Sequence, residues 1–200
     1  RNGKGTNTVF ARIGGDVGTD HAWRAGISRL KAESARRATT NGSATDLFTG
    51  TGELTGVDFV WKWAPNGNPK ERNLKFQTEY FTRDENGTFD PASAGTPLAY
   101  RGKQNGWYAQ GIYQFMPRWR VGLRHDKLES DGVNAALAGS VLDNQGHKPT
   151  RASLMLDYSN SEFSRLRFQV NRDESRLNEK DTQWYLQYIM SIGAHGAHAF

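Results

Sequence analysis

The sequence predicts an all-β protein, an antiparallel transmembrane β-barrel with about nine strands in this chain. Segments such as 166–170 (LRFQV) and 184–192 (WYLQYIMSI) place apolar or aromatic residues at every second position, which is the period of a strand with two unlike faces. The mean hydropathy is only −0.75, yet the chain contains six Trp, seven Tyr and ten Phe. Polar residues on one face of many strands are typical of a barrel around water.

The amino-acid composition limits the classes of protein to which the chain can belong. With 36% apolar residues in 200, a soluble domain would have little aliphatic filling for its core, whereas a water-filled barrel needs one apolar face per strand. No run of about 18 apolar residues occurs, which excludes a transmembrane helix at the sequence level. The chain has no cysteine, so disulfides and thiolate metal sites are excluded. It begins at Arg1 without a Met or a signal peptide, and we expect a mature or truncated product.

Nine strands are predicted in order along the chain from alternation bounded by turn-forming residues. They span residues 7–18, 22–35, 53–64, 73–84, 98–116, 119–130, 150–158, 164–174 and 182–194. Short connections are predicted at 18–21, 65–72, 116–118 and 159–163. Long ones, rich in Gly, Asn, Asp, Ser and Thr, are predicted at 36–52, 85–97 and 131–149, with a shorter one at 175–181. Short turns on one rim and long loops on the other predict that the short turns face the periplasm.

In each strand, the alternate positions that carry apolar residues are predicted to face lipid. This assignment places all six tryptophans outward, near the two membrane interfaces where amphipathic aromatic residues collect. The predicted interface aromatics are Trp23, Trp61, Trp63, Trp107, Trp119, Trp184 and the terminal Phe200. Phe200 also resembles the terminal aromatic signal that the barrel-assembly machinery reads. The alternative weighed against this is a soluble all-β sandwich whose aromatics fill a core.

The opposite parity predicts a charged lumen with more bases than acids. The predicted pore-lining residues are Arg12, Arg24, Lys62, Lys75, Arg120, Arg124, Arg151, Arg165, Arg167, Asp58, Glu79 and Asp126, with Asp16 and Asp157 on the same parity. Such a surplus in a water-filled pore favours anions. Two interpretations stay open for each of these charged residues. Either its charge contributes to the positive electrostatic potential of the pore, or it pairs with a residue on a neighbouring strand and stabilises the barrel wall.

A resemblance to a known family is carried by the segments 60–68 (VWKWAPNGN), 106–108 (GWY) with 113–124 (YQFMPRWRVGLR), 161–167 (SEFSRLR) and 186–198 (LQYIMSIGAHGAH). They resemble the C-terminal half of proteobacterial outer-membrane proteins described as TonB-dependent (zinc-regulated) receptors or as phosphate-selective-porin-like proteins. TonB-dependent receptors require a plug domain and a far larger barrel, and the chain resembles neither. The resemblance therefore implies a porin-like protein of the bacterial outer membrane.

The resemblance also implies further strands before this chain. An odd number of strands leaves unpaired backbone edges, which cannot lie in lipid. About seven upstream strands would give an even barrel of about sixteen. We therefore expect residues 1–200 to be one outer-membrane region, the C-terminal part of a longer barrel.

The predicted function is a channel for passive passage of small hydrophilic solutes with a mild anion preference. The alternative is a non-conducting receptor or a structural component of an envelope assembly. Expected partners are outer-membrane lipid and lipopolysaccharide, the barrel-assembly machinery, small anionic solutes, and a homo-oligomer or larger envelope complex. Nucleic acid is not expected, because the bases are spread over every strand. No catalytic set, metal site or cofactor is predicted, since the five histidines are scattered and form no catalytic pattern.

Overall fold

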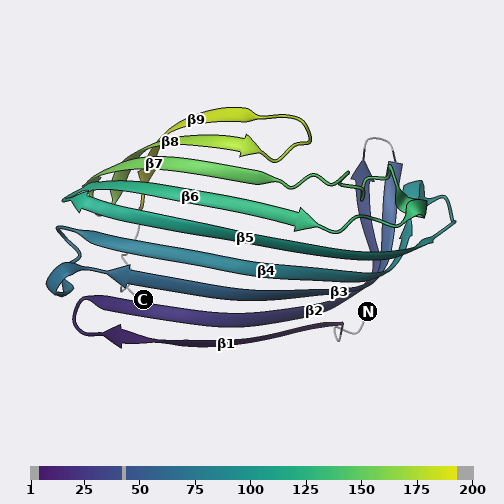
Figure 1. The fold of residues 1–200 in the computed structure, drawn as a ribbon, viewed down its shortest axis with the longest axis horizontal. Helices are drawn as coiled ribbons and strands as arrows, with labels where there is room; N and C mark the ends of the chain where they lie inside the picture. The colour runs from purple at the N-terminus through teal and green to yellow at the C-terminus, as the bar shows by residue number, and fades with distance from the viewer. Residues whose placement is uncertain (1–4, 42–43, 193–200) are drawn as a thin grey trace.

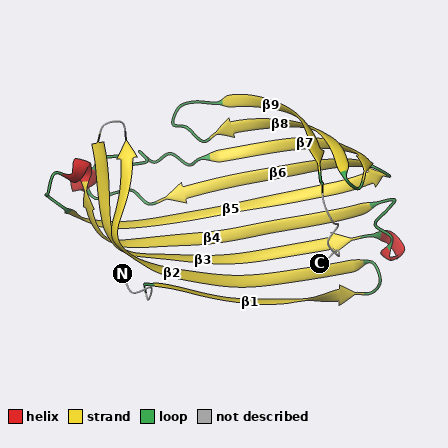
Figure 2. Cartoon of the chain, turned by 180° about the vertical axis from the view of Figure 1, so that it is seen from behind, coloured by secondary structure: helices red, strands yellow, loops and turns green. Residues whose placement is uncertain are grey.

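Nine strands form one antiparallel sheet in which each strand pairs with its neighbours in sequence, β1 to β9. The structure is a computed structural model that describes residues 5–41 and 44–192. The sheet is curved, and its two edges, β1 and β9, do not pair with each other among these residues (Figures 1 and 2). The strands are β1 (Thr6–Val17), β2 (His21–Asn41), β3 (Ala44–Trp63), β4 (Asn73–Asp90), β5 (Leu98–Met116), β6 (Trp119–Ser130), β7 (Thr150–Ser161), β8 (Ser164–Glu174) and β9 (Asp181–Met190).

The predicted all-β antiparallel fold class is confirmed, and three strand predictions match at both ends. These are 98–116, 119–130 and 164–174. The remaining strands lie where alternation predicted them. The last strand ends at Met190, and residues 193 and 194 of its predicted range lie outside the described residues.

Two predicted long loops are wrong. Residues 36–52 mostly extend β2 and β3, and residues 85–90 extend β4 as far as a short 3₁₀ turn, η2 (Pro91–Ser93). These segments are rich in Gly, Thr, Asn and Asp, a composition that is typical of loops. They pair as strands because each continues the register of its neighbour, as Phe48–Phe89 and Thr51–Asn86 do. Residues 131–149 are the predicted long loop, and contain only the short turn η3 (Ala135–Leu137).

The extended β2–β3 hairpin bends away from the direction of the other strands at its tip (Figures 1 and 2). The register of β2 shifts between Ser34 and Arg37, which marks a β-bulge, a feature that bends a strand. On the other side of β3, Gly50 lies opposite Gly87. A Cβ on Gly50 would lie 2.2 Å from the Asn86 carbonyl oxygen and 2.7 Å from Gly87 Cα, so this close approach requires glycine.

A small hydrophobic core lies on the inner side of this extension. Phe48, Phe89 and Tyr100 come from β3, β4 and β5, and Leu137 from the 131–149 loop packs against them with 2% of its surface exposed. The rings of Phe48 and Tyr100 meet edge to face at a centroid distance of 5.8 Å. The loop is therefore anchored against the inner face of the sheet at the long-loop rim.

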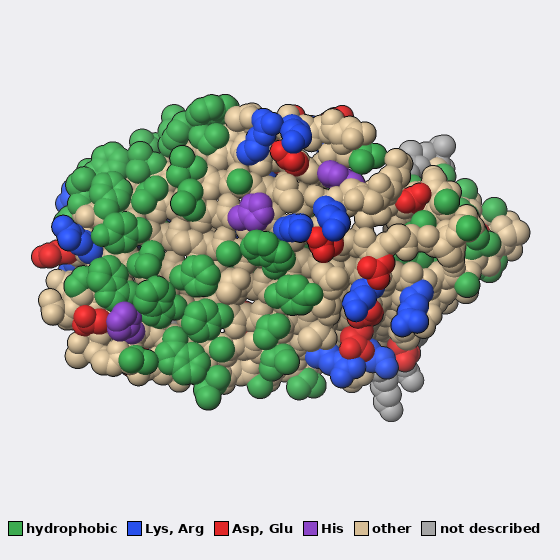
Figure 3. All heavy atoms as spheres, in the orientation of Figure 1, with side chains coloured by type: hydrophobic (Ala, Val, Ile, Leu, Met, Phe, Trp, Pro, Cys, Tyr) green, Lys and Arg blue, Asp and Glu red, His purple; other side chains and the backbone are tan. Residues whose placement is uncertain are grey.

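Cross-strand register separates the sheet into two chemically different faces. One continuous row of paired positions contains Gly15, Trp23, Trp61, Phe76, Gly111, Leu123, Leu154, Val170 and Trp184. The neighbouring row, on the opposite face, contains Arg24, Val60, Gln77, Gln110, Arg124, Ser153, Asn171 and Gln183. We call the first the outer face and the second the inner face. Figure 3 shows hydrophobic side chains over much of one face, with Lys, Arg, Asp and Glu gathered toward the long loops.

Replacing Leu137 with Ala should release the 131–149 loop from the sheet. Truncating a buried leucine removes apolar contacts and leaves a cavity, which costs about 2–4 kcal/mol. Amide hydrogen exchange across residues 131–149 should therefore accelerate, while exchange in β6 stays slow. Val141→Ala is the matched control, because Val141 lies in the same loop with 56% of its surface exposed. Equal exchange in both variants would show that Leu137 does not anchor the loop.

Candidate functional site

The inner face of the sheet carries every residue predicted to line a lumen. Register places on it Arg12, Arg24, Lys62, Lys75, Arg120, Arg124, Arg151, Arg165, Arg167, Asp58, Glu79 and Asp126, as well as Asp16 and Asp157. Charged groups recur on this face from β1 to β8. The inner face is thus a polar wall, and its charges fall into paired and clustered groups.

Asp157 is the centre of the tightest paired group. It is 1% exposed and lies between Arg120 and Arg167 in the register. Arg167 donates from Nε and Nη2 to the two Asp157 oxygens, at 2.7 and 2.9 Å, and Arg165 Nη1 lies 3.6 Å from the same carboxylate. Two-pronged arginine–carboxylate geometry is strong and directional. Arg167 therefore braces the wall between β7 and β8.

A second group crosses the middle of the inner face. Arg124 contacts Asp126 at 2.6 Å, and its guanidinium carbon lies 3.9 Å from the centroid of the Tyr108 ring. The Tyr108 hydroxyl in turn accepts a 2.6 Å hydrogen bond from Gln77. Arg151 is paired with Asp173 on β8. Arg151 is therefore paired across strands, one of the two interpretations left open by the sequence, whereas Arg124 pairs with Asp126 on its own strand, β6.

Arg12 and Asp58 approach each other across Gly26, which lies between them in the register of β1, β2 and β3. A Cβ on Gly26 would lie 2.3 Å from an Asp58 oxygen and 3.1 Å from Arg12 Cγ. Glycine thus provides the space in which these two side chains lie. On the neighbouring β4, Glu79 is the register partner of Asp58.

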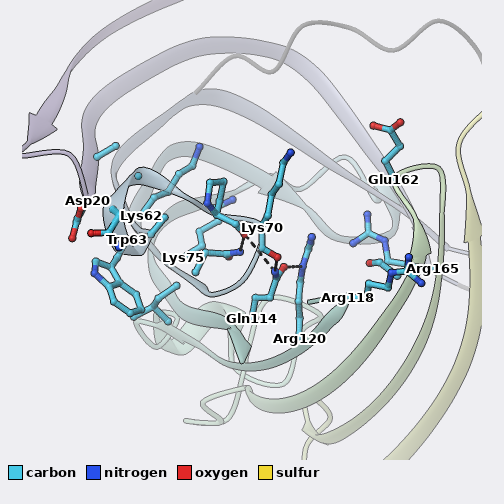
Figure 4. A pocket seen from close by; sticks show the side chains of 18 of the residues that line it. Asp20, Lys62, Trp63, Lys70, Lys75, Gln114, Arg118, Arg120, Glu162 and Arg165 are labelled. Carbon is cyan, nitrogen blue, oxygen red and sulfur yellow. Dashed lines mark hydrogen bonds between the residues drawn. The ribbon is translucent and has the colours of Figure 1, made fainter. Parts of the chain in front are cut away.

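Near the short turns, the inner face concentrates positive charge. Lys62 and Lys75 are direct register partners on β3 and β4. Like charges directly opposite each other lower the stability of a sheet, so this register concentrates positive charge at an energetic cost. Figure 4 shows Arg120 and Arg165 on the other side of the space that the curved sheet encloses, opposite Lys62 and Lys75.

The connection between β3 and β4, residues 64–72, folds over this part of the inner face. It contains the 3₁₀ turn η1 (Pro65–Gly67) and is held by Gln114 of β5, which is 4% exposed. The Gln114 amide nitrogen donates to the carbonyl oxygens of Pro69, Lys70 and Glu71, at 3.3, 2.7 and 3.3 Å. Its amide oxygen accepts a 3.2 Å hydrogen bond from Arg120 Nε. We call residues 65–72 the pinned turn.

The pinned turn and the neighbouring short turns border a cavity of about 1380 Å³. Its charged lining comprises the bases Lys62, Lys70, Lys75, Arg118, Arg120 and Arg165 and the acids Asp16, Asp20 and Glu162. In Figure 4 the ribbon curves around these side chains, with the pinned turn between Lys62 and Arg120. Sequence parity could not identify Lys70, Arg118, Asp20 or Glu162, because all four lie in turns rather than on strands.

The six predicted interface tryptophans lie on the outer face by register: Trp23, Trp61, Trp63, Trp107, Trp119 and Trp184. Some of them lie against rings on neighbouring strands at tilted angles, such as Trp119 against Tyr158 at 5.0 Å and Trp107 against His125 at 5.4 Å. Trp61 also donates a 3.2 Å hydrogen bond to His21. Phe200 lies outside the described residues.

In the part of the chain that the structure describes, every helical element is too short and too polar to span a bilayer. Within residues 5–41 and 44–192, no group of three or more His, Cys, Asp or Glu side chains is arranged to hold a metal ion.

Comparison with known proteins supports the fold. No family model matches the chain. An uncharacterized protein of Aquifex aeolicus is 28% identical over 162 residues, which are 76% of this chain and 32% of that protein. The chain thus spans about a third of this relative's length.

Among solved structures, OmpT, an outer-membrane protein of Vibrio cholerae, aligns with a TM-score of 0.50 and 12% identity, over 84% of this chain and 45% of that chain. A structure of the NanC porin aligns with a TM-score of 0.47 and 10% identity, over 96% of each chain. The fold is that of a bacterial outer-membrane β-barrel, which agrees with the predicted location in the bacterial outer membrane.

Replacing Gln114 with Glu should release the pinned turn. The substitution keeps the size of the side chain but exchanges the donating amide for a carboxylate, which cannot donate to the three carbonyl oxygens when ionised. Each lost hydrogen bond costs about 1 kcal/mol, so amide exchange in residues 65–72 should rise at least tenfold. Gln104→Glu, at an exposed position of the same strand, should leave this exchange unchanged. Slow exchange in the Gln114 variant would mean that other contacts hold the turn.

Proposed function

We propose that this chain forms part of the wall of an outer-membrane channel through which small hydrophilic solutes pass passively, with a mild preference for anions. One observation carries the proposal: the same strands present aromatic and aliphatic groups on the outer face and charged or amide groups on the inner face. A soluble sandwich would instead bury an apolar inner face. A curved sheet with an apolar outside and a polar inside suits a water-filled barrel in lipid.

Closure of the barrel is part of the proposal. The edges of β1 and β9 carry backbone groups that need partners in a membrane, and about seven further strands would provide them and give a barrel of about sixteen. Resemblance to the phosphate-selective-porin-like family supports this, because its members have additional strands upstream. The Aquifex relative also extends well beyond the matched region.

The anion preference is assigned to the cavity at the short-turn end. Its lining has six Lys or Arg, of which Arg165 lies 3.6 Å from the Asp157 carboxylate, and three Asp or Glu. Farther along the inner face, Arg124, Arg151 and Arg167 each contact a carboxylate. A paired arginine contributes little net field at a distance, but an excess of positive groups around a cavity raises the local anion concentration. Lys62 and Lys75, which lie directly opposite each other in this lining, are the residues chosen to test the assignment.

A second candidate function is a non-conducting outer-membrane receptor or structural component. The observation that favours it is the 131–149 loop, which packs Leu137 against the inner side of β3, β4 and β5. A loop held inside the rim narrows the entrance, and a sufficiently occluded barrel would not conduct.

The experiment is single-channel recording of the full-length protein in planar bilayers, comparing the parent with the Lys62→Gln/Lys75→Gln double variant. Removing two positive charges should lower the anion-over-cation permeability ratio about twofold or more in 0.1 M salt. The difference should fade in 1 M salt, because the Debye length falls from about 10 Å to about 3 Å.

Arg124→Gln/Asp126→Asn is the matched control, because it removes a contacting pair and leaves the net charge unchanged. This variant should keep the parent permeability ratio. If the lysine variant has the same reversal potentials as the parent, the cavity does not set selectivity. If the parent protein inserts but never conducts, the receptor or structural function is favoured.

A further inference from the structure

Large apolar side chains also occur on the inner face, between its charged middle and the long-loop rim. One row in register crosses the sheet from β1 to β6 as Phe10, Ser28, Gly56, Phe81, Gly106 and Leu128. The next row toward the long loops pairs Leu30 with Leu54. Apolar groups from five strands therefore lie together on the side of the sheet that faces the lumen. We call Phe10, Leu30, Leu54, Phe81 and Leu128 the inner apolar belt.

Two members of the inner apolar belt meet above a glycine. Gly106 lies between Phe81 and Leu128 in the register. A Cβ on Gly106 would lie 2.5 Å from Phe81 Cζ and 2.6 Å from Leu128 Cδ2. Both side chains therefore lean over the glycine from opposite sides and form a continuous apolar surface.

The belt is open to the lumen. Leu30, Leu54 and Leu128 expose 37%, 40% and 46% of their surface, whereas Val60 and Met155, apolar residues of the inner face nearer the short turns, expose only 6% and 8%. Large apolar groups that stay exposed together commonly mark a binding surface. Because this surface faces the inside of a barrel, its occupant is a molecule in the lumen.

Two arginines border the belt on its long-loop side. Arg83 is the register partner of Leu54, and both Arg83 Nη2 and Arg37 Nη1 donate to the same oxygen, Oε1, of Glu85. Glu85 is 7% exposed, but the two arginine side chains are 42% (Arg37) and 40% (Arg83) exposed. The buried carboxylate thus positions two guanidinium groups, and the part of this cluster that solvent reaches is positive. We call Arg37 and Arg83 the arginine pair.

The charge on the short-turn side of the belt is different. The next row there contains the acids Asp58, Glu79, Asp126 and Asp173 and the bases Arg12 and Arg151. One row farther, Arg124 contacts Asp126. Carboxylates thus balance or outnumber the bases on this side, so an anionic group lying on the belt is attracted toward the arginine pair and away from the short turns.

The spacing of the two features suits one small molecule. Phe81 and Arg83 are two residues apart on the same face of β4, and such positions are separated by about 7 Å along a strand. A ligand with an apolar body and a carboxylate two or three bonds away can therefore contact both. Mostly apolar surface with a few polar groups that fix orientation is typical of small-molecule sites.

We propose that the inner apolar belt and the arginine pair bind organic monocarboxylates with an apolar body, and that these are a solute class of the channel. The apolar body lies on Leu54 and Phe81, and the carboxylate bridges Arg37 and Arg83, because guanidinium groups match carboxylate geometry. A small inorganic anion would gain nothing from the belt. The inference rests on the proposed function in one respect: the inner face must line a lumen that solutes can enter.

The test is equilibrium dialysis of three probes against the full-length protein in lipid nanodiscs, with empty nanodiscs as the baseline for partition into lipid. The probes are 3-phenylpropionate, acetate, which lacks the apolar body, and 3-phenylpropan-1-ol, which lacks the charge. The parent should bind 3-phenylpropionate at least tenfold more tightly than either of the other two, because only this probe uses both parts of the site.

Two variants separate the parts of the site. Leu54→Thr/Phe81→Thr should weaken binding of 3-phenylpropionate about tenfold, because apolar contact is lost. Arg37→Gln/Arg83→Gln/Glu85→Gln removes the arginine pair together with its buried carboxylate, so that no unpaired charge is left inside the protein. This variant should bind 3-phenylpropionate no more tightly than the alcohol, and its affinity for the alcohol should equal that of the parent.

The matched control is Val60→Thr/Ile112→Thr, which changes two apolar residues of the inner face nearer the short turns and should leave binding of all three probes unchanged. Heat-modifiable electrophoretic mobility identifies folded protein in every sample. The proposal is overturned if the folded parent shows no saturable binding of 3-phenylpropionate, or if acetate or the alcohol binds as tightly. An equal loss in the control and in the Leu54/Phe81 variant would also overturn it.

The channel itself can fail independently of this site, because dialysis detects binding without conduction. A parent protein that binds 3-phenylpropionate with the expected dependence on both variants, but never conducts in planar bilayers, would contradict passive passage and support the site. A parent that conducts but does not bind the probe would support the channel and contradict the site.

Discussion

Backbone N–H and C=O groups have no water to bind in the hydrocarbon of a membrane, so each must find a partner within the protein. In this chain, eight consecutive antiparallel pairings meet that requirement between β1 and β9. Pairing fixes the register, and register fixes the face on which each side chain lies. The row from Trp23 through Trp61 and Leu123 to Trp184 and the polar row beside it follow from one set of hydrogen bonds.

On the inner face, the same register decides which charges neutralise each other. Asp157 lies beside two arginines, Arg120 and Arg167, and Arg124 reaches Asp126 on its own strand. Lys62 and Lys75, by contrast, are direct partners of the same sign, which the sheet tolerates at an energetic cost. The inner face therefore combines braced regions with one region of concentrated positive charge, next to a turn that Gln114 holds in place.

Much of this could be predicted from the sequence, because a two-residue period is a local signal. It located β5, β6 and β8 to the residue and assigned the six tryptophans to one face. It failed at 36–52 and 85–90, where Gly, Thr and Asn pair as strands outside the apolar belt and no apolar alternation marks them. The sequence predicted a connection at 65–72 but not its attachment to Gln114, because Gln114 and Lys70 are 44 residues apart and meet only through the tertiary fold.

The two-faced sheet is tested most directly by chemical labelling of adjacent residues in the full-length protein reconstituted in vesicles, with any native cysteines removed. This chain has no cysteine of its own. Single substitutions Phe76→Cys and Gln77→Cys place a thiol on the outer and the inner face of β4. A membrane-impermeant, water-soluble thiol reagent should modify the Gln77→Cys protein rapidly and leave the Phe76→Cys protein unmodified. Rapid labelling at Phe76 with protection at Gln77 would contradict the account.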